Sequence, residues 1–320
     1  MWIPLSPSRK AVRTDPFKPW ELRKAYEEGR NIIRLVRESA QSEFNDERGI
    51  ELSYDLQSGS YISAVETPAG REQRRSYGRH LLDVFADLGE IDSLLEAGVG
   101  EGITLWHLLD QMSRVPHHAH GFDLCWSRVG CAANWMAGLV PHFKTTLVTG
   151  SLLNVPYQDN SFDVVYTSHS IEPNHGREAE ILTELYRVAS RYLVLLEPAY
   201  ELAQPEARAR MEMHGYCRAL PATARKLGFK VLRHEIFAGS WTTTNPTALL
   251  VIAKDPQAPP AVPKFACPAF GTPMTRMADC FYSPQSMRAY PIIGGIPCLR
   301  SAAGIIASKL GELAARHGSE

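Results

Sequence analysis

A glycine-rich loop between two acidic residues is the feature of this sequence best suited to binding a ligand. Gly98, Gly100 and Gly102 follow an apolar run that carries Glu96, and Asp123 stands 21 residues after Gly102 at the end of the next run. Glycine lets the backbone turn tightly and lets a ligand approach main-chain amides. An acid placed like Asp123 can accept hydrogen bonds from both hydroxyls of a ribose, or it can cap the following helix. The first alternative predicts an adenosine-containing ligand.

A second polar segment, residues 168–175 (SHSIEPNH), follows the fourth apolar run. Ligands of open α/β sheets bind outside the carboxyl ends of the strands, so this segment should face the same ligand. His169 is a candidate general base, because the ordinary pKa of histidine suits proton removal at neutral pH. We predict His169, Glu172 and His175 as catalytic candidates and Ser168 as a ligand contact. The alternative for His169 is a structural role at the strand end.

A third polar group follows the fifth apolar run. Glu197 and Tyr200 come directly after it, and Arg210 and His214 follow one helix length later. We predict these four residues in the pocket of an acceptor substrate. Each could instead cap a helix or lie on the surface.

Short apolar runs alternate with helical segments from residue 93 onward, which is typical of βαβ units on a parallel sheet. The last two runs have no convincing helix between them, so they could form an antiparallel hairpin. The sequence therefore predicts an α/β fold with a doubly wound, mostly parallel sheet of seven strands. The expected strands are 93–97, 118–123, 145–148, 162–167, 192–197, 230–236 and 248–253.

In combination these motifs resemble the class I S-adenosylmethionine-dependent methyltransferases. The resemblance covers about residues 90–255 and depends on four successive strand ends: the acid with three glycines, then Gly121-Phe-Asp123, then Gly150-Ser151-Leu152, then the segment 156–163 (PYQDNSFD). It implies a Rossmann-like methyltransferase fold, S-adenosylmethionine as cofactor and S-adenosylhomocysteine as product.

The resemblance also implies roles for single residues. Glu96 would contact the methionine part of the cofactor and Asp123 the ribose, while Leu124 and Trp126 would flank the adenine. Ser151 stands where the family usually carries an acid that accepts a hydrogen bond from the adenine amino group, and serine can still accept one. The predicted cofactor residues are Glu96, Gly98, Gly100, Gly102, Asp123, Leu124, Ser151, Leu152, Ser168, Gln57 and Tyr61.

The segment 54–61 (YDLQSGSY) is unusually polar and aromatic for a linker. Similar segments in the family fold over the cofactor as a lid, which implies that Gln57 and Tyr61 contact the cofactor or substrate and that Tyr54 contacts the substrate. A plain turn is the alternative.

Charge and hydropathy disfavour a nucleic-acid partner and a membrane partner. The chain has 34 basic and 35 acidic residues, a net charge of −1, whereas nucleic-acid binding usually needs a basic surface. The basic run Arg71, Arg74, Arg75 and Arg79 is interpreted as a solvated helix face. Because there is no apolar run of about 20 residues and no secretory signal, we predict no membrane partner and a cytoplasmic location.

The chain is expected to divide into five parts. They are an N-terminal arm and helical lid at 1–89, with a helix over 20–39 interrupted at Gly29; the cofactor domain at 90–255; a proline-rich linker at 256–264; a small unit at 265–299; and a C-terminal helix at 300–320. The small unit resembles a zinc ribbon in which each Cys-x-x-Cys motif keeps only its first cysteine, Cys267 or Cys280. A closed zinc site needs four ligands, so we predict no metal and a unit held by apolar packing that includes Phe270.

The predicted function is methyl transfer from S-adenosylmethionine to oxygen or nitrogen of a small metabolite, such as a sugar or sugar nucleotide. Three alternatives stay open at this point: an RNA-modifying methyltransferase, a catalytically inactive binding subunit, and a nicotinamide oxidoreductase. A homodimer is also open.

Overall fold

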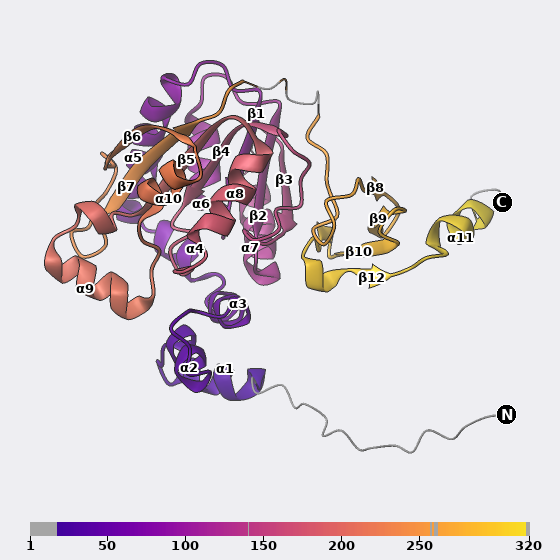
Figure 1. Cartoon of the computed structure of the whole chain (residues 1–320), viewed down its shortest axis with the longest axis horizontal. Helices are drawn as coiled ribbons and strands as arrows, with labels where there is room; N and C mark the ends of the chain where they lie inside the picture. The colour runs from indigo at the N-terminus through magenta and orange to yellow at the C-terminus, as the bar shows by residue number, and fades with distance from the viewer. Residues whose placement is uncertain (1–17, 140, 257, 259–261, 318–320) are drawn as a thin grey trace.

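The computed structural model describes residues 18–139, 141–256, 258 and 262–317. Its centre is a seven-stranded sheet in the order β3-β2-β1-β4-β5-β7-β6 (Figure 1). Neighbouring strands from β3 to β5 are parallel, and β7 is antiparallel to both β5 and β6. The strands are β1 (Ser93–Ala97), β2 (His118–Asp123), β3 (Thr145–Thr149), β4 (Phe162–Ser168), β5 (Ala189–Pro198), β6 (Lys230–Ile236) and β7 (Thr247–Ala253). The predicted fold class and the antiparallel final pair are confirmed.

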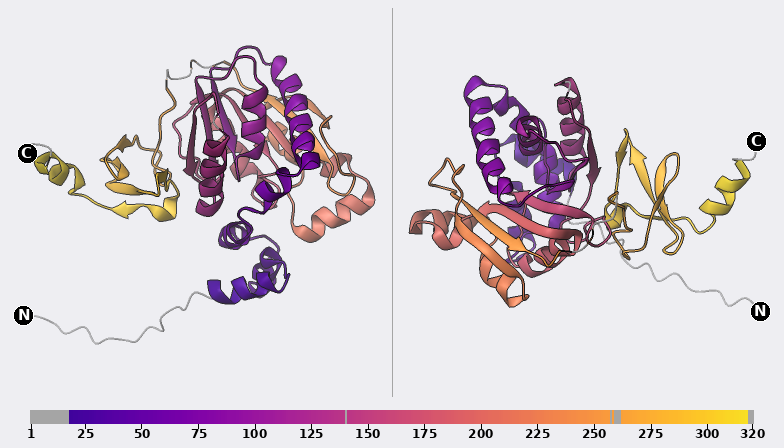
Figure 2. Two further views of the ribbon diagram at one scale, coloured as in Figure 1. Left: turned by 180° about the vertical axis from the view of Figure 1, so that it is seen from behind. Right: turned by 90° about the horizontal axis from the view of Figure 1, so that it is seen from above.

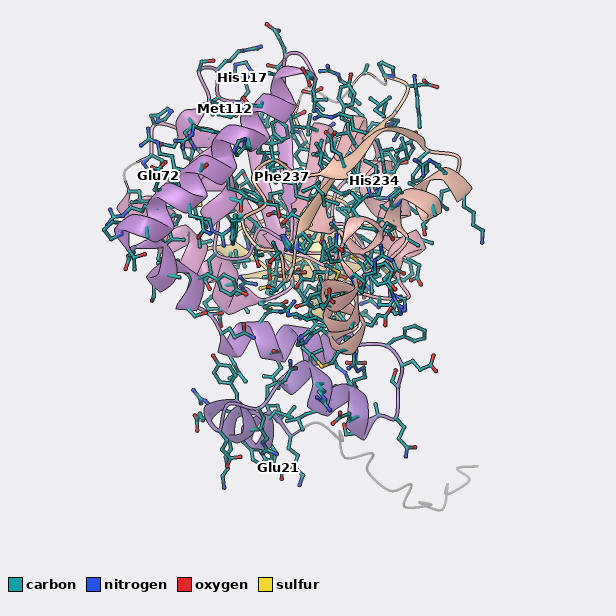
Figure 3. The ribbon with its side chains drawn as sticks, turned by 90° about the vertical axis from the view of Figure 1, so that its left-hand side faces the viewer. Glu21, Glu72, Met112, His117, His234 and Phe237 are labelled. Carbon is teal, nitrogen blue, oxygen red and sulfur yellow. The ribbon has the colours of Figure 1, made fainter. Side chains whose placement is uncertain are left out.

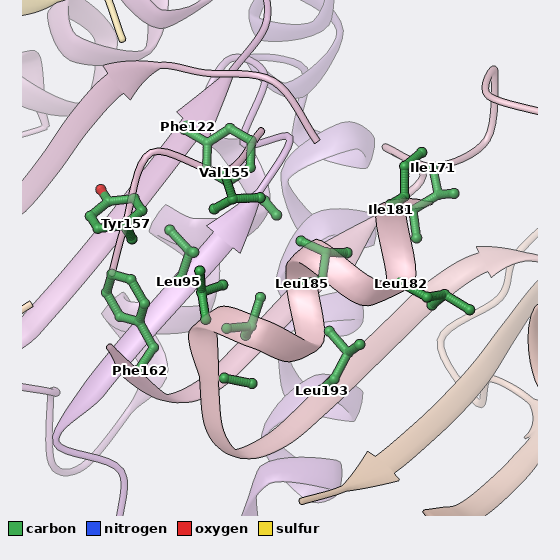
Figure 4. Close-up of a cluster of buried hydrophobic side chains, with 14 of the residues drawn as sticks. Leu95, Phe122, Val155, Tyr157, Phe162, Ile171, Ile181, Leu182, Leu185 and Leu193 are labelled. Atoms are coloured by element: carbon green, nitrogen blue, oxygen red, sulfur yellow. The ribbon is translucent and has the colours of Figure 1, made fainter. Parts of the chain in front are cut away.

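Helices cover both faces of this sheet (Figure 2). Successive strand residues point to opposite faces, so Leu94 packs with α5 and α6, whereas Leu95 packs with α8 and α10. Figure 4 shows part of the hydrophobic cluster around Leu95, in which Leu182 and Leu185 of α8 lie against the sheet. The helices are α5 (Pro68–Ala86), α6 (Ile103–Gln111), α7 (Trp126–Gly138), α8 (Glu178–Val188) and α10 (Leu220–Lys226). A short 3-10 turn, η1 (Tyr200–Leu202), and α9 (Pro205–His214) lie between β5 and α10.

Four helices precede α5 in the described part of the chain. They are α1 (Pro19–Glu27), α2 (Ile32–Ser39), α3 (Glu47–Leu56) and α4 (Ser60–Val65). The predicted break at Gly29 is confirmed, because that residue has a φ of +78° between α1 and α2. Glu21 on α1 lies at the far end of this helical group, whereas Phe237 lies within the α/β body (Figure 3). The segment 54–61 comprises the end of α3 and the start of α4, so it is not the plain turn that was the alternative to a lid.

The C-terminal unit is a small antiparallel sheet beside the edge strand β3 (Figure 1). Thr149 of β3 pairs with Cys298, and the Leu299 amide donates to the Thr149 carbonyl at 3.1 Å. The Trp126 indole donates to the Ile293 carbonyl at 3.3 Å, so this residue contacts the C-terminal unit. The elements are β8 (Thr275–Arg276), β9 (Cys280–Ser283), β10 (Arg288–Ile293), β11 (Ile296–Pro297), η2 (Ser301–Ala303), β12 (Ile305–Ile306) and α11 (Leu310–His317).

Two expectations about this unit are wrong. The C-terminal helix begins only at Leu310, because Gly304 disfavours a helix and the β-branched pair 305–306 joins β10 as a strand. Phe270 is 62% exposed and lies under the Arg288 guanidinium instead of packing inside. The Cys267 thiol contacts the Tyr290 hydroxyl at 3.1 Å, and within the described ranges no three His, Cys, Asp or Glu side chains form a metal-binding group.

Among the residues that the structure describes, no helix is both long and apolar enough to cross a bilayer. Residues 1–17, which fall in the predicted N-terminal arm, and residues 257 and 259–261 of the predicted linker 256–264 lie outside the described residues.

Candidate functional site

A cavity of about 350 Å³ opens at the carboxyl ends of β1, β2 and β4. The strand order reverses between β1 and β4, which is where ligands of doubly wound sheets bind. The volume lies within the range of roughly 300–1,000 Å³ common for small-molecule sites. The predicted site residues that line it are Glu96, Gly98, Gly100, Asp123, Leu124, Leu152, Ser168, His169, Glu172, Tyr54 and Tyr61.

The glycine loop is shaped by its contacts with neighbouring elements. The amides of Gly98 and Val99 both donate to the Phe122 carbonyl at 2.8 Å, which holds the loop against β2. Gly98 has a φ of +79°, and a Cβ there would lie 2.1 Å from the Ser170 Cβ. A Cβ on Gly102 would lie 2.8 Å from the Met136 sulfur of α7. Gly98, which borders the cavity, thus leaves room for Ser170, and Gly102 leaves room for Met136 of α7.

Asp123 caps α7 and also lines the cavity. Its Oδ1 accepts from the Cys125 amide at the start of α7, and its Oδ2 accepts from the Gly100 amide, each at 2.9 Å. The side chain is buried yet lines the cavity. Since each carboxylate oxygen can accept a further hydrogen bond, Asp123 can still bind ligand hydroxyls.

Glu96 is a buried carboxyl group at the bottom of the cavity. It accepts a hydrogen bond of 2.8 Å from the Tyr166 hydroxyl. Burial raises the pKa of Glu96 to about 8, although the Tyr166 bond opposes the shift. Without a ligand this group is mostly protonated at pH 7, and a cation beside it would favour its ionised form.

Helices α3 and α4 cover the cavity. The Glu101 carboxylate accepts from the amides of Gly59 at 3.0 Å and Ile62 at 2.8 Å, so it caps α4. The Arg128 guanidinium lies 4.7 Å from the ring centre of Tyr61 and 5.2 Å from that of Tyr54. These contacts join both helices to the glycine loop and to α7.

Helix α3 also contacts the end of β3. The Ser151 hydroxyl donates to the carboxylate of Glu47, which lines the cavity, whereas Ser151 itself does not. One turn along, Glu51 forms an ion pair with Arg300 of the C-terminal unit. The Asp55 carboxylate accepts from the Ser127 amide of α7 at 3.1 Å. Position 151 carries no acid, but the Glu47 carboxylate of α3 lies beside it.

His169 and Glu172 form a coupled pair on the loop after β4. The His169 Nδ1 lies 2.5 Å from Glu172 Oε2, and Nε2 lies 2.8 Å from the Thr247 hydroxyl. Burial lowers the pKa of His169, but the hydrogen bond and charge of Glu172 outweigh burial and raise it overall. Glu172 also accepts from Asn245 at 3.2 Å. The pair can hold a proton next to the cavity.

Glu197 does not line the cavity. Its carboxylate accepts from the amides of Ser170, Ile171 and Glu172, each at 3.1 Å. Burial raises the pKa of Glu197 to about 7. These hydrogen bonds support a role for Glu197 in fixing the loop that carries His169. Because Glu197 does not line the cavity, the structure does not place it in contact with an acceptor there.

The other predicted residues also lie away from the cavity lining. His175 contacts Glu178 at 2.9 Å, and Gln57 donates to the Ser53 carbonyl at 3.1 Å. Tyr200 donates to Glu212, while Arg210 and His214 both contact the ring of Tyr216. Tyr216 also forms a hydrogen bond with the Glu172 carboxylate, which joins this group to the loop after β4.

Arg74 is the main cavity residue that sequence reasoning assigned wrongly. Arg71, Arg75 and Arg79 are exposed as predicted, but Arg74 lines the cavity. Its guanidinium carbon lies 4.8 Å from the ring centre of Trp241. Position 74 shares a helix face with the buried residue Tyr77, three positions on, and this spacing was the available signal.

Residues 94–191 match the family model of the methyltransferase domain. The methyltransferase-domain match thus spans β1 to the start of β5 and includes the glycine loop, Asp123 and His169.

Three individual proteins resemble this chain at low sequence identity. Norajmaline N-methyltransferase of Rauvolfia serpentina is 29% identical over 119 residues, which is 37% of this chain and 39% of that enzyme, so the chain spans about two fifths of that relative's length. Magnesium protoporphyrin IX methyltransferase of Synechocystis PCC 6803, solved with bound S-adenosylhomocysteine, has a TM-score of 0.48 and 16% identity, covering 66% of this chain and 100% of that one. The [4+2]-cyclase SpnF has a TM-score of 0.49 and 16% identity, covering 67% and 98%.

Proposed function

We propose that the protein binds S-adenosylmethionine and transfers its methyl group to an oxygen or nitrogen of a small metabolite. The observation that carries the proposal is the meeting of Glu96, the glycine loop and Asp123 in one cavity beside a half-buried histidine, His169. The match of residues 94–191 to the methyltransferase domain supports it. The cofactor would supply an electrophilic methyl group on its sulfonium.

The residues present fit such a cofactor. A Cβ at Gly98 would collide with Ser170, so glycine lets the loop after β4 approach the glycine loop closely at the cavity wall. Asp123 would accept from the ribose hydroxyls, and Glu96 would face the methionine part. Glu47, held by Ser151, would accept from the adenine amino group in place of the missing strand-end acid. Leu124 and Leu152 would contribute apolar contacts from the cavity wall.

His169 is the proposed general base for the acceptor. Its Nε2 faces the Thr247 hydroxyl, and the Glu172 carboxylate stabilises the imidazolium that proton removal would create. The acceptor would lie near Trp241 and Asn245, which line the cavity beside this pair. The name of the Rauvolfia relative states an N-methyl transfer, which adds weight to a nitrogen acceptor. Covering helices and a net charge of −1 favour a small metabolite, including a sugar or sugar nucleotide, over a nucleic acid.

Calorimetric titration tests the cofactor. We expect S-adenosylmethionine and S-adenosylhomocysteine to bind at micromolar concentration, NAD not to bind, and Asp123→Ala to weaken both cofactor forms at least tenfold. Asp87→Ala, an exposed acid on the far end of α5, is the control and should leave binding unchanged. No binding of either compound, or a preference for NAD, would overturn the proposal.

Acceptor screening follows with a labelled methyl donor and panels of amines and hydroxyl compounds. Transfer to one class that His169→Gln slows by about 100-fold or more, with cofactor affinity unchanged, would support the base role. An unchanged transfer rate in His169→Gln would support methyl transfer but exclude His169 as its general base.

A further inference from the structure

The C-terminal unit is joined to the α/β body along the edge strand β3. Cys298 pairs with Thr149 in parallel, and the Leu299 amide donates to the Thr149 carbonyl at 3.1 Å. The Leu299 side chain is fully buried in the hydrophobic cluster that also contains Val148 of β3 and Phe122 of β2. Because this core is closely packed, it fixes the chain that follows Leu299 beside the carboxyl end of β3.

Two side chains that leave this paired edge contact one face of α3. Both chains run in the same direction, so Ser151 and Arg300 each stand two residues beyond the paired residues. Ser151 contacts the carboxylate of Glu47, and the Arg300 guanidinium forms an ion pair with Glu51. The two acids are four positions apart on the helix, which places them on the same face. The end of β3 and the C-terminal unit thus hold α3 at neighbouring points.

The contact between Arg300 and Glu51 is partly shielded from water. The Arg300 side chain is 18% exposed and the Glu51 side chain 32% exposed. Among the described residues, Glu51 is the carboxylate to which Arg300 is paired, and the Arg300 Nε is buried without a hydrogen-bond partner. A guanidinium keeps its charge in such a place. Partly shielded charges also interact more strongly than fully exposed ones, so this pair can fix the position of the helix.

Helix α3 forms part of the cavity wall. Glu47, Ile50 and Tyr54 line the cavity at spacings of three and four residues along the helix. Asp55, near the end of α3, contacts α7, whereas Glu47 and Glu51 of the first two turns contact the end of β3 and the C-terminal unit. A shift of these first turns would therefore change the wall of the cavity.

We propose that the C-terminal unit acts as part of the cofactor site, with Arg300 as a positioning residue that holds α3 over the cavity through Glu51. The ligand-binding half of this inference rests on the proposed function. A ligand bound under α3 and the unit docked on β3 favour the same position of the helix, so each strengthens the other. Removing the charge of Arg300 loosens α3 and weakens the ligand while the unit itself stays folded.

Hydrogen exchange of the ligand-free protein tests the contact directly. Arg300→Gln and Glu51→Gln are compared with the double variant, and Arg276→Gln, at an exposed position of β8, is the matched control in the same unit. We expect each single variant to accelerate exchange in residues 47–56 about 3- to 10-fold and to leave residues 280–293 unchanged. The double variant should exchange no faster than either single variant, because the two side chains act as a pair. Arg300→Lys should recover part of the effect.

Calorimetric titration with S-adenosylhomocysteine tests the coupling to the cavity. We expect Arg300→Gln to weaken binding about 3- to 10-fold and Arg276→Gln to behave as the wild type. Unchanged exchange in residues 47–56 of Arg300→Gln, equal acceleration throughout the chain, or an unchanged affinity would overturn the inference while the proposed function stands. If the wild type does not bind S-adenosylhomocysteine, the proposed function fails and the ligand-binding half fails with it, whereas exchange still decides whether Arg300 holds α3.

Discussion

Replacing Glu96 by glutamine should stabilise the ligand-free protein, and increasingly so as the pH rises. In the folded protein burial raises the pKa of Glu96 from 4.5 to about 8, whereas in the unfolded chain the group has its ordinary value. The folded state therefore keeps a proton that the unfolded state releases. The stability associated with this proton is fully present below the unfolded pKa and is lost as the pH rises through the folded pKa. Glutamine carries no such penalty, and its amide oxygen can still accept from Tyr166.

The size of the effect follows from the pKa shift. At about 1.4 kcal/mol per pKa unit the shift corresponds to at most about 5 kcal/mol above pH 8. Water in the cavity and relaxation around the ionised group reduce this, so we expect Glu96→Gln to gain about 1–3 kcal/mol at pH 8.5. At pH 5 the gain should be about 1 kcal/mol or less, because this pH lies only half a unit above the unfolded pKa of 4.5 and the folded state still keeps its proton.

Urea unfolding of the ligand-free wild type and variant at pH 5, 7 and 8.5 measures this difference. Glu90→Gln is the control, because Glu90 is an exposed acid at the start of the same strand region and should show no pH-dependent gain. A variant that is less stable than the wild type at pH 8.5, or a difference that does not change with pH, would refute the assigned environment of Glu96. The same variant should bind S-adenosylhomocysteine more weakly, since it cannot form the charged contact with the ammonium group.

Three further predictions concern the loop, the covering helices and the proposed base. Glu101→Gln removes the charge that caps α4, so hydrogen exchange in residues 57–65 should accelerate and cofactor affinity should fall about tenfold; unchanged exchange would contradict the capping role. Gly98→Ala should destabilise by about 2 kcal/mol or more in thermal unfolding, whereas Gly138→Ala, with open space around it, should be neutral or stabilising. Glu172→Gln should lower the pKa of His169 and move the acidic limb of kcat/KM to lower pH; a limb that stays in place would exclude His169 as the base.

Local patterns predicted the sheet well because strand formation in a buried parallel sheet depends on short apolar runs. All seven expected strands are present, with ends that differ by at most three residues. The helical interruption at Gly29 and the antiparallel final pair follow from similarly local signals. A helical lid was predicted within residues 1–89, but the bounds of α3 and α4 were not, because their residues are stabilised by contacts with distant segments, such as the capping of α4 by Glu101.

The combination of polar strand ends, from Glu96 and the three glycines to Asp123 and the segment 168–175, was sufficient to predict a ligand site at the carboxyl ends of the strands. Tertiary structure decided which acids face it, because a strand end does not reveal what lies above each side chain. Glu96 and Glu197 both lie near strand ends, yet Glu96 lines the cavity and Glu197 is covered by three amides of the next loop. Likewise only the packing of α5 separates Arg74, inside the cavity, from Arg75 in solvent. Sequence determined the elements and their order, and packing decided which side chains reach the ligand.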